Sequence, residues 1–237
     1  MAEMGRRTLL VDFDPQGHMT KALGVAPAPE GDANLARVLL GQWSGELNDL
    51  VVKVSDNLYL IPTSLDMFNL ASQMMGRAGR EYLLSLFLDA FDGIFDECVI
   101  DTQPALEVLT DNAIVAARRH EHGDQVVIPV QSEDSSLDAL RLFIKQIKTL
   151  EQVLRINIAI AGLVVNQYDS RRGKIATSTL AAFQQLPDLE VLAIIQDRKE
   201  IREGWRLKEP VITHAPTSEP AEWYRDLAKT LLTRSGA

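Results

Sequence analysis

Short apolar runs alternate with longer amphipathic stretches along this chain of 237 residues. The short runs are rich in valine, isoleucine and leucine. Several of them are apolar without interruption, which is typical of strands that are buried on both faces. We expect strands at residues 8–12, 58–62, 97–101, 125–130, 158–166 and 190–195.

The longer stretches carry apolar residues three or four positions apart, which is the spacing of one helix face. We expect helices at residues 34–40, 67–90, 108–117, 136–154, 175–185 and 220–233. Strands that alternate with helices in this way predict the α/β class, in which helices cover both faces of a mostly parallel, twisted sheet.

The last expected helix allows two interpretations. It begins with a proline, which suits a first helical turn, and it carries an apolar stripe. The stripe consists of Trp223, Tyr224, Leu227, Ala228 and Leu231. Such a stripe either lies on a membrane surface or docks on the sheet, and docking is the commoner role in an α/β protein.

The composition suits one α/β domain that covers residues 1–237, with 46% hydrophobic and 24% charged residues. The single cysteine, Cys98, lies in an apolar run, so we expect a small buried side chain in a reducing compartment. No apolar stretch approaches the ~20 residues that span a bilayer, and no signal region follows the first charges. We therefore expect a cytoplasmic protein that makes no membrane contact.

The charge pattern restricts nucleic-acid binding to local patches, because the formal net charge is -9. Arg171, Arg172 and Lys174 form one basic cluster, and residues 198–208 contain a second. Acidic residues interrupt the second cluster, so a solvated charged helix explains it equally well. The first cluster is the candidate DNA contact.

Two expected strands end in carboxylates that are suited to a ligand site. Asp12 and Asp14 end the first strand, and Asp101 ends the strand at residues 97–101. Ligands of open α/β sheets bind at the carboxyl ends of strands, where an aspartate can hold Mg²⁺ through water. The alternative for each aspartate is a cap of the following turn. Two such ends, each followed by a turn with proline, favour the ligand site.

These residues also carry a family resemblance. Residues 9–20 (LLVDFDPQGHMT) resemble the segment that follows the first helix in ParA-type partition ATPases. Further similarity lies at residues 79–83, 128–133, 162–171 and 224–228, in the order and spacing of that family. The resemblance covers nearly every expected element, and it implies a P-loop NTPase-like fold that uses ATP and Mg²⁺.

The resemblance also implies roles for single residues. Asp14 would position the attacking water and Asp12 would support the metal site. Asp101 would hold Mg²⁺, and Asn166 would lie where related proteins read adenine. Each residue has a strand-end cap or a turn former as its alternative, and for Asn166 the two interpretations are equally good.

One part of the family pattern has no counterpart in this sequence. The family's phosphate-binding loop is a glycine-rich turn with a lysine and a threonine, and the nearest match here, Gly173-Lys174-Ile175, lacks the hydroxyl residue. Residues 2–7 resemble the end of the family's first helix. We therefore expect that the first strand and the P-loop are missing, and that residues 1–237 hydrolyse ATP poorly and fold poorly alone.

The loop at residues 118–123 looks inserted relative to the family. It contains His120 and His122, which suggest a metal. Two loop histidines without a third ligand do not make a metal site, so we assign none there.

Three hypotheses follow. The first is an ATP-dependent partition protein of a plasmid or chromosome that acts on non-specific DNA, with a homodimer and a centromere-binding ParB-like partner as implied assemblies. The second is an interaction or regulatory protein that keeps the ParA fold without nucleotide turnover. The third, an ATPase that positions division or membrane machinery, requires a basic amphipathic tail, and residues 229–237 are too short and too mixed in charge to form one.

Overall fold

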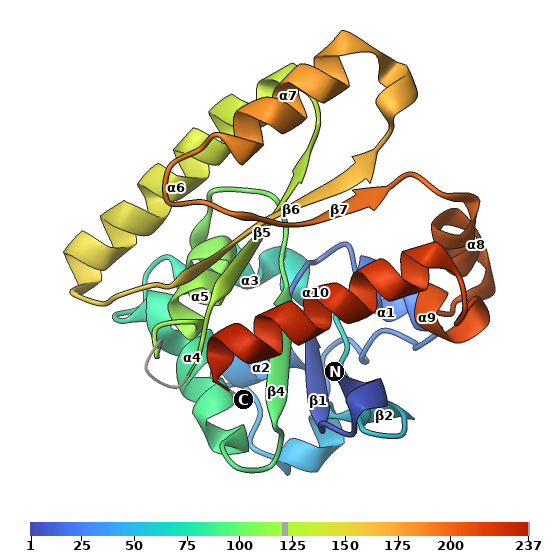
Figure 1. The fold of residues 1–237 in the computed structure, drawn as a ribbon. Coiled ribbons are helices and arrows are strands. Elements are labelled where there is room, and N and C mark those ends of the chain that lie inside the picture. Colours follow the sequence, from blue (N-terminus) through green and yellow to red (C-terminus); the bar gives the residue numbers. More distant parts are fainter. Residues whose placement is uncertain (120–122, 237) are drawn as a thin grey trace. The chain divides into compact units, whose positions relative to one another are not determined.

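The computed structural model describes residues 1–119 and 123–236 (Figure 1). The chain divides into two compact units, Met1–Ala116 and Ala117–Ala237. Each unit has its own β-sheet with its own helices. The α/β class is confirmed.

The sheet of the first unit has the strand order β2-β3-β1-β4. Its strands are β1 (Thr8–Asp12), β2 (Val52–Ser55), β3 (Leu58–Ile61) and β4 (Glu97–Asp101). β1 runs parallel to both of its neighbours, β3 and β4. β2 runs antiparallel to β3, and the turn between them contains Asn57 at φ 59°, a left-handed conformation that asparagine tolerates well. The carboxyl ends of β1, β3 and β4 therefore meet at one edge of the sheet.

Short helices surround this sheet. The α-helices are α1 (His18–Ala22), α2 (Leu35–Leu39), α3 (Met67–Met74), α4 (Leu83–Leu88) and α5 (Val108–Ala116). The 3-10 helices are η1 (Ala2–Met4), η2 (Leu47–Leu50), η3 (Arg80–Tyr82) and η4 (Asp89–Phe91). The single helix expected at residues 67–90 is wrong, because the chain turns at Gly79, which has φ 65° and begins η3.

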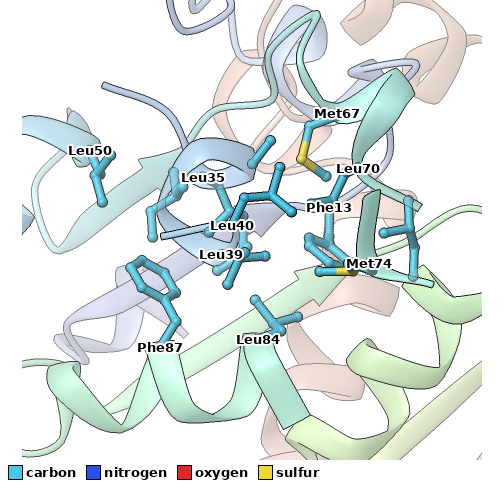
Figure 2. Close-up of a cluster of buried hydrophobic side chains, with 14 of the residues drawn as sticks. Phe13, Leu35, Leu39, Leu40, Leu50, Met67, Leu70, Met74, Leu84 and Phe87 are labelled. Carbon is cyan, nitrogen blue, oxygen red and sulfur yellow. The ribbon is translucent and has the colours of Figure 1, made fainter. Parts of the chain in front are cut away.

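The core of the first unit forms between the sheet and these helices. Leu9, Val11 and Phe13 are fully buried, so β1 supplies alternate side chains to one face. Figure 2 shows Phe13 with the buried side chains of Met67, Leu70 and Met74 from α3, and of Leu84 and Phe87 from α4. Burial of a side chain of this size contributes roughly 1.5–3 kcal/mol. Packing in this core therefore holds the carboxyl end of β1 in a fixed position.

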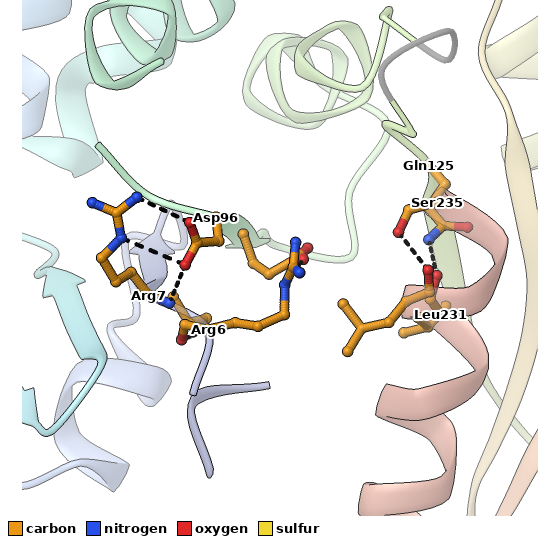
Figure 3. A network of polar contacts seen from close by, with 9 residues as sticks. Arg6, Arg7, Asp96, Gln125, Leu231 and Ser235 are labelled. Carbon is orange, nitrogen blue, oxygen red and sulfur yellow. Dashed lines mark hydrogen bonds and ion pairs between the residues drawn. The ribbon is translucent and has the colours of Figure 1, made fainter. Parts of the chain in front are cut away.

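The first unit is also tied together where its strands begin. The backbone N–H of Arg7 donates to Asp96 Oδ2 at 2.7 Å, and Arg7 Nη2 donates to Asp96 Oδ1 at 3.0 Å (Figure 3). These bonds join the residue before β1 to the residue before β4. They hold the register in which Asp12 lies opposite Asp101.

β4 is the last strand in the order of its sheet, and it is more exposed than its sequence predicts. Cys98 is exposed and Val99 is 41% exposed. The expectation of a buried cysteine is wrong, because β4 pairs with β1 along one edge and with no second strand in residues 1–119 and 123–236.

The second unit contains a parallel sheet in the order β5-β6-β7. Its strands are β5 (Val126–Gln131), β6 (Ile160–Tyr168) and β7 (Val191–Gln196). Its helices are α6 (Asp134–Leu154), η6 (Ser170–Arg172), α7 (Lys174–Gln184), α8 (Lys199–Leu207), α9 (Val211–His214) and α10 (Glu219–Ser235). The core of this unit centres on Leu163, Val165 and Phe183, which are fully buried.

α10 packs against β7, which confirms docking on the sheet as the role of its apolar stripe. The Ser218 hydroxyl accepts a hydrogen bond from the backbone of Ala221 and caps the start of this helix, which has Pro220 in its first turn. Gln125 Nε2 donates to the backbone carbonyl of Leu231 at 3.1 Å and ties α10 to the residue before β5 (Figure 3). Within the described residues, no helix is both long enough and apolar enough to cross a membrane.

Candidate functional site at the carboxyl end of β1

Asp12 ends β1 and is fully buried. Its Oδ2 atom accepts two hydrogen bonds from Thr20, one from the backbone N–H at 2.7 Å and one from the hydroxyl. Thr20 reaches Asp12 because the chain reverses at Gly17, which has φ 65° and precedes α1. A non-glycine residue would be strained at that φ. The sequence after β1 therefore builds a tight turn that folds back over the strand end.

Asp14 lies in the same turn and is 9% exposed. Its Oδ1 atom accepts a hydrogen bond from the backbone N–H of Gln16 at 2.9 Å, and its backbone carbonyl accepts one from Gly17 at 3.0 Å. One carboxylate oxygen thus caps the turn, as the structural alternative for this residue expects. The carboxylate keeps its second oxygen, Oδ2, for other partners.

Asp101 ends β4 directly opposite Asp12 in the register of the two parallel strands. Neighbouring strands lie about 4.8 Å apart, and paired residues point to the same face. The backbone N–H of Phe13 donates to the Asp101 carbonyl at 2.8 Å and closes this end of the sheet. The structure therefore brings together the three aspartates that the sequence singles out.

The electrostatics of Asp101 confirm that negative charge accumulates here. Asp101 is exposed overall, but partial desolvation of its carboxyl is the largest cause that raises its pKa from the ordinary 3.8 to about 6. The carboxylates of Asp12 and Asp14 raise this pKa as well, and His18 opposes them. Three carboxylates at the same edge of a sheet repel one another, so their charges are unfavourable unless a cation or a proton neutralises them.

A buried atom provides the test of whether Mg²⁺ fits here. Asp12 Oδ1 is buried and has no hydrogen-bond partner, although Oδ2 of the same carboxylate has two donors. In the described part of the chain, no group of three or more acidic, histidine or cysteine side chains could hold a metal ion by itself. Mg²⁺ commonly takes one or two carboxylates and completes its shell with water and phosphate oxygens. The residues present fit a Mg²⁺ ion that is shared with a phosphate ligand.

Two residues of this site, Thr20 and Thr63, were not among the predicted site residues. Thr63 follows β3 and is 4% exposed. Its backbone N–H donates to Thr20 Oγ1 at 3.1 Å, and its hydroxyl donates to the carbonyl of Asp14 at 2.9 Å. The available signal was a hydroxyl residue directly after an expected strand, at the edge where strands 8–12 and 97–101 also end.

The other predicted site residues lie in the second unit. Asn166 is on β6, where its Oδ1 atom accepts a hydrogen bond from the backbone of Gln167 at 2.9 Å. It is in register with Gln131 at the end of β5. Asn166 lies two residues before the end of β6, and both its turn-former and its adenine interpretation stay predictions.

The predicted DNA contacts lie around η6. Arg171 is exposed and makes two hydrogen bonds to Asp169, Nε to Oδ1 at 2.8 Å and Nη2 to Oδ2 at 2.9 Å. This carboxylate raises the pKa of Arg171 and offsets its positive charge. Lys174 is exposed at the start of α7, and the side chain of Arg172 lies outside the described part. His120 and His122 also lie outside the described residues.

Comparison with known proteins identifies the family. The family model described as an AAA domain matches residues 1–160. The chromosome-partitioning ATPase Soj of Thermus thermophilus is 30% identical, over 99% of this chain and 86% of its own length. The chain belongs to the family of ParA-type P-loop ATPases. The chromosome partitioning protein ParA of Caulobacter vibrioides, another member, is 29% identical over 99% of this chain and 85% of its own length.

A solved structure supports the same ParA-type assignment. The crystal structure of cobyrinic acid a,c-diamide synthase from Mycobacterium smegmatis, with a bound ATP analogue and magnesium, is 31% identical in sequence with a TM-score of 0.78. The match covers 99% of this chain and 85% of that chain. The P-loop NTPase-like fold that the sequence analysis expects is therefore confirmed.

Proposed function

We propose that this chain is a DNA-partitioning protein of the ParA type that binds Mg²⁺ and ATP at the carboxyl ends of β1 and β4. The observation that carries the proposal is the buried, unpartnered Oδ1 atom of Asp12. It lies at a strand end where Asp14 and Asp101 add negative charge. A carboxylate oxygen that is buried without a donor is costly, and a cation would remove that cost.

The three aspartates have different roles in this proposal. Bound Mg²⁺-ATP would supply the phosphoryl group and a metal that neutralises developing charge. Asp101 would hold the metal through water, and Asp12 would support the metal site with Oδ1. Asp14 would accept a hydrogen bond from the attacking water at Oδ2, because Oδ1 already accepts one from the Gln16 backbone.

The phosphate side of the proposed site needs a loop that the 237 residues do not contain. A lysine-bearing, glycine-rich loop supplies backbone N–H groups and a point charge to the phosphates, and no such loop occurs in the 237 residues. We therefore propose that these residues by themselves hydrolyse ATP at a negligible rate. Turnover requires that a phosphate-binding loop be supplied to the site.

The implied partners belong to the same proposal. By the family resemblance, Asn166 would read an adenine base, and the cluster of Arg171, Arg172 and Lys174 would contact DNA phosphates without sequence preference. Because Asp169 already neutralises Arg171, Lys174 is the stronger contributor of the two residues whose side chains are described. A homodimer and a centromere-binding ParB-like protein complete the assembly.

One observation favours the alternative, an interaction protein without nucleotide turnover. Leu65, Phe68 and Met75 lie at or beside α3 and are 60%, 54% and 59% exposed. Phe68 lies in α3, Leu65 lies two residues before the helix, and Met75 follows it directly. Exposed apolar patches of this kind mark sites of protein contact.

The deciding experiment measures ATP binding and hydrolysis by this chain, beside a version that carries any upstream encoded phosphate-binding loop. We expect that only the extended version binds and turns over ATP, and that Asp101→Asn weakens its Mg²⁺ dependence. Asp56→Asn is the matched control, because Asp56 lies in the β2–β3 turn with its side chain 97% exposed. If neither version binds ATP, the nucleotide proposal fails and the interaction protein replaces it.

A further inference from the structure

Thr63 joins three segments of the first unit at the candidate site. It lies two residues after the end of β3, and it is buried. Its backbone N–H donates to Thr20 Oγ1 on α1 at 3.1 Å. Its backbone carbonyl accepts a hydrogen bond from Ala28 at 2.8 Å. These two bonds attach the end of β3 to α1 and to the loop that follows α1.

The side chain of Thr63 makes a third bond, directly to the turn that carries the predicted catalytic acid. Its hydroxyl donates to the backbone carbonyl of Asp14 at 2.9 Å. The same carbonyl accepts the N–H of Gly17 at 3.0 Å, and the Asp14 carboxylate accepts the N–H of Gln16 at 2.9 Å. The Thr63 hydroxyl therefore comes from 49 residues away in sequence and completes the hydrogen bonding of the Asp14 turn.

The methyl group of Thr63 contacts the other end of the turn, at Gly17. A Cβ atom at Gly17 would lie 2.4 Å from Thr63 Cγ2, which is too close for any side chain. The methyl thus packs directly against the glycine backbone, while the hydroxyl bonds to the carbonyl of Asp14. The two branches of one threonine side chain hold both ends of the Asp14–Gly17 turn.

We propose that Thr63 is a positioning residue, which fixes the Asp14 turn through its hydroxyl and so sets the direction of the Asp14 carboxylate. The consequence for catalysis rests on the proposed function, in which Asp14 orients the attacking water. Displacement of a catalytic group by about 1 Å can cost roughly 100-fold in rate, so a distant hydroxyl can matter to the reaction.

Two substitutions test the hydroxyl and the methyl group of Thr63 separately. Thr63→Val keeps the branched shape and removes the hydroxyl, and Thr63→Ser keeps the hydroxyl and removes the methyl. The matched control is Thr8→Val. Thr8 is 3% exposed, and its hydroxyl donates to the carbonyl of Arg6 at 3.0 Å, at the opposite end of β1 from the site.

The first readout is amide hydrogen exchange in the full chain. In Thr63→Val we expect the amides of Gln16 and Gly17 to exchange roughly two- to tenfold faster, because the carbonyl of Asp14 loses a donor and the turn opens more often. We expect wild-type exchange at these amides in Thr63→Ser and in Thr8→Val. Equal exchange in Thr63→Val and Thr8→Val would overturn the proposal.

The second readout is steady-state ATP hydrolysis by whichever form of the protein turns over ATP. We expect kcat of Thr63→Val to fall roughly tenfold while KM for ATP changes little, and Thr63→Ser to restore kcat. An unchanged kcat in Thr63→Val would overturn the positioning role. If no form hydrolyses ATP, the proposed function fails, and the exchange of Gln16 and Gly17 still decides whether Thr63 fixes the turn.

Discussion

Asp101 is the residue whose environment has the clearest consequence for pH. Its folded-state pKa is about 6, against an ordinary 3.8, so the folded chain holds a proton between these values that the unfolded chain has lost. The free energy of unfolding therefore decreases as pH rises from about 4 to about 6. Above that range the ionised carboxylate makes a constant destabilising contribution to the free energy of unfolding.

The substitution Asp101→Asn tests this contribution. We expect it to raise the free energy of unfolding at pH 7.5 by roughly 1 kcal/mol, which is less than the full pKa shift implies because the exposed surface of this residue screens the charge. The gain should disappear at pH 4, where wild-type Asp101 is protonated. Urea unfolding at the two pH values measures the difference, with Asp56→Asn as the exposed control. A gain of the same size at both pH values would contradict the argument.

At the scale of elements, the sequence predicted those features that depend on local periodicity. β1 and β4 occupy the residues expected for them, and the other predicted strands begin and end within two residues of expectation. β2 was missed because its four residues pair only as the edge of a hairpin, without a buried run. α1 was missed because its five residues depend on the turn at Gly17 rather than on an apolar stripe.

The candidate site could also be predicted only in part. The aspartates at the ends of β1 and β4 could be placed at one sheet edge, because parallel strands end together. Their partners Thr20 and Thr63 were missed, because hydrogen bonds from hydroxyl groups leave no periodic pattern in the sequence. Only the position of Thr63, directly after an expected strand, pointed to the site. Asn166 was placed at a strand end, but β6 continues to Tyr168, and neither the ligand of Asn166 nor its position relative to the aspartates follows from periodicity.

Asn112 of α5 is the polar residue that joins the broken helical segment to its neighbours. It is fully buried, its Oδ1 atom accepts the N–H of Leu84 at 3.0 Å, and its Nδ2 atom donates to the carbonyls of Arg80 and Val108 at 2.8 Å. Asn112→Leu would leave these groups unpaired. We expect a loss of about 2–4 kcal/mol in the free energy of unfolding, measured in urea. A loss below about 0.5 kcal/mol would contradict this role.

At the scale of the whole molecule, the sequence analysis expected one domain over residues 1–237. The structure divides into two compact units, each with a separate sheet and a separate hydrophobic core. The single-domain expectation stays a prediction, because two compact units with the same α/β character can still belong to one domain. The sequence shows no linker between them that is rich in glycine, proline or serine.

Two separate cores predict that the 237 residues do not unfold in a single cooperative step. We expect a broad or biphasic thermal transition, with a calorimetric enthalpy larger than the van't Hoff value. Hydrogen exchange during heating should show the amides of β1 and β6 losing protection at different temperatures. One sharp transition, with coincident loss of protection in both strands, would contradict this expectation and the expectation that the chain folds poorly alone.

The outer edge of β4 has a practical consequence for anyone who concentrates this protein. The strand Glu97–Asp101 has acidic residues only at its ends, and it contains neither the lysine nor the proline that commonly protects an edge strand from pairing with another chain. Cys98 and Val99 are exposed between those acids. Concentrated, oxidising solutions therefore favour edge-to-edge association followed by a disulfide between copies. Dilute handling with a reducing agent should keep the chain monodisperse.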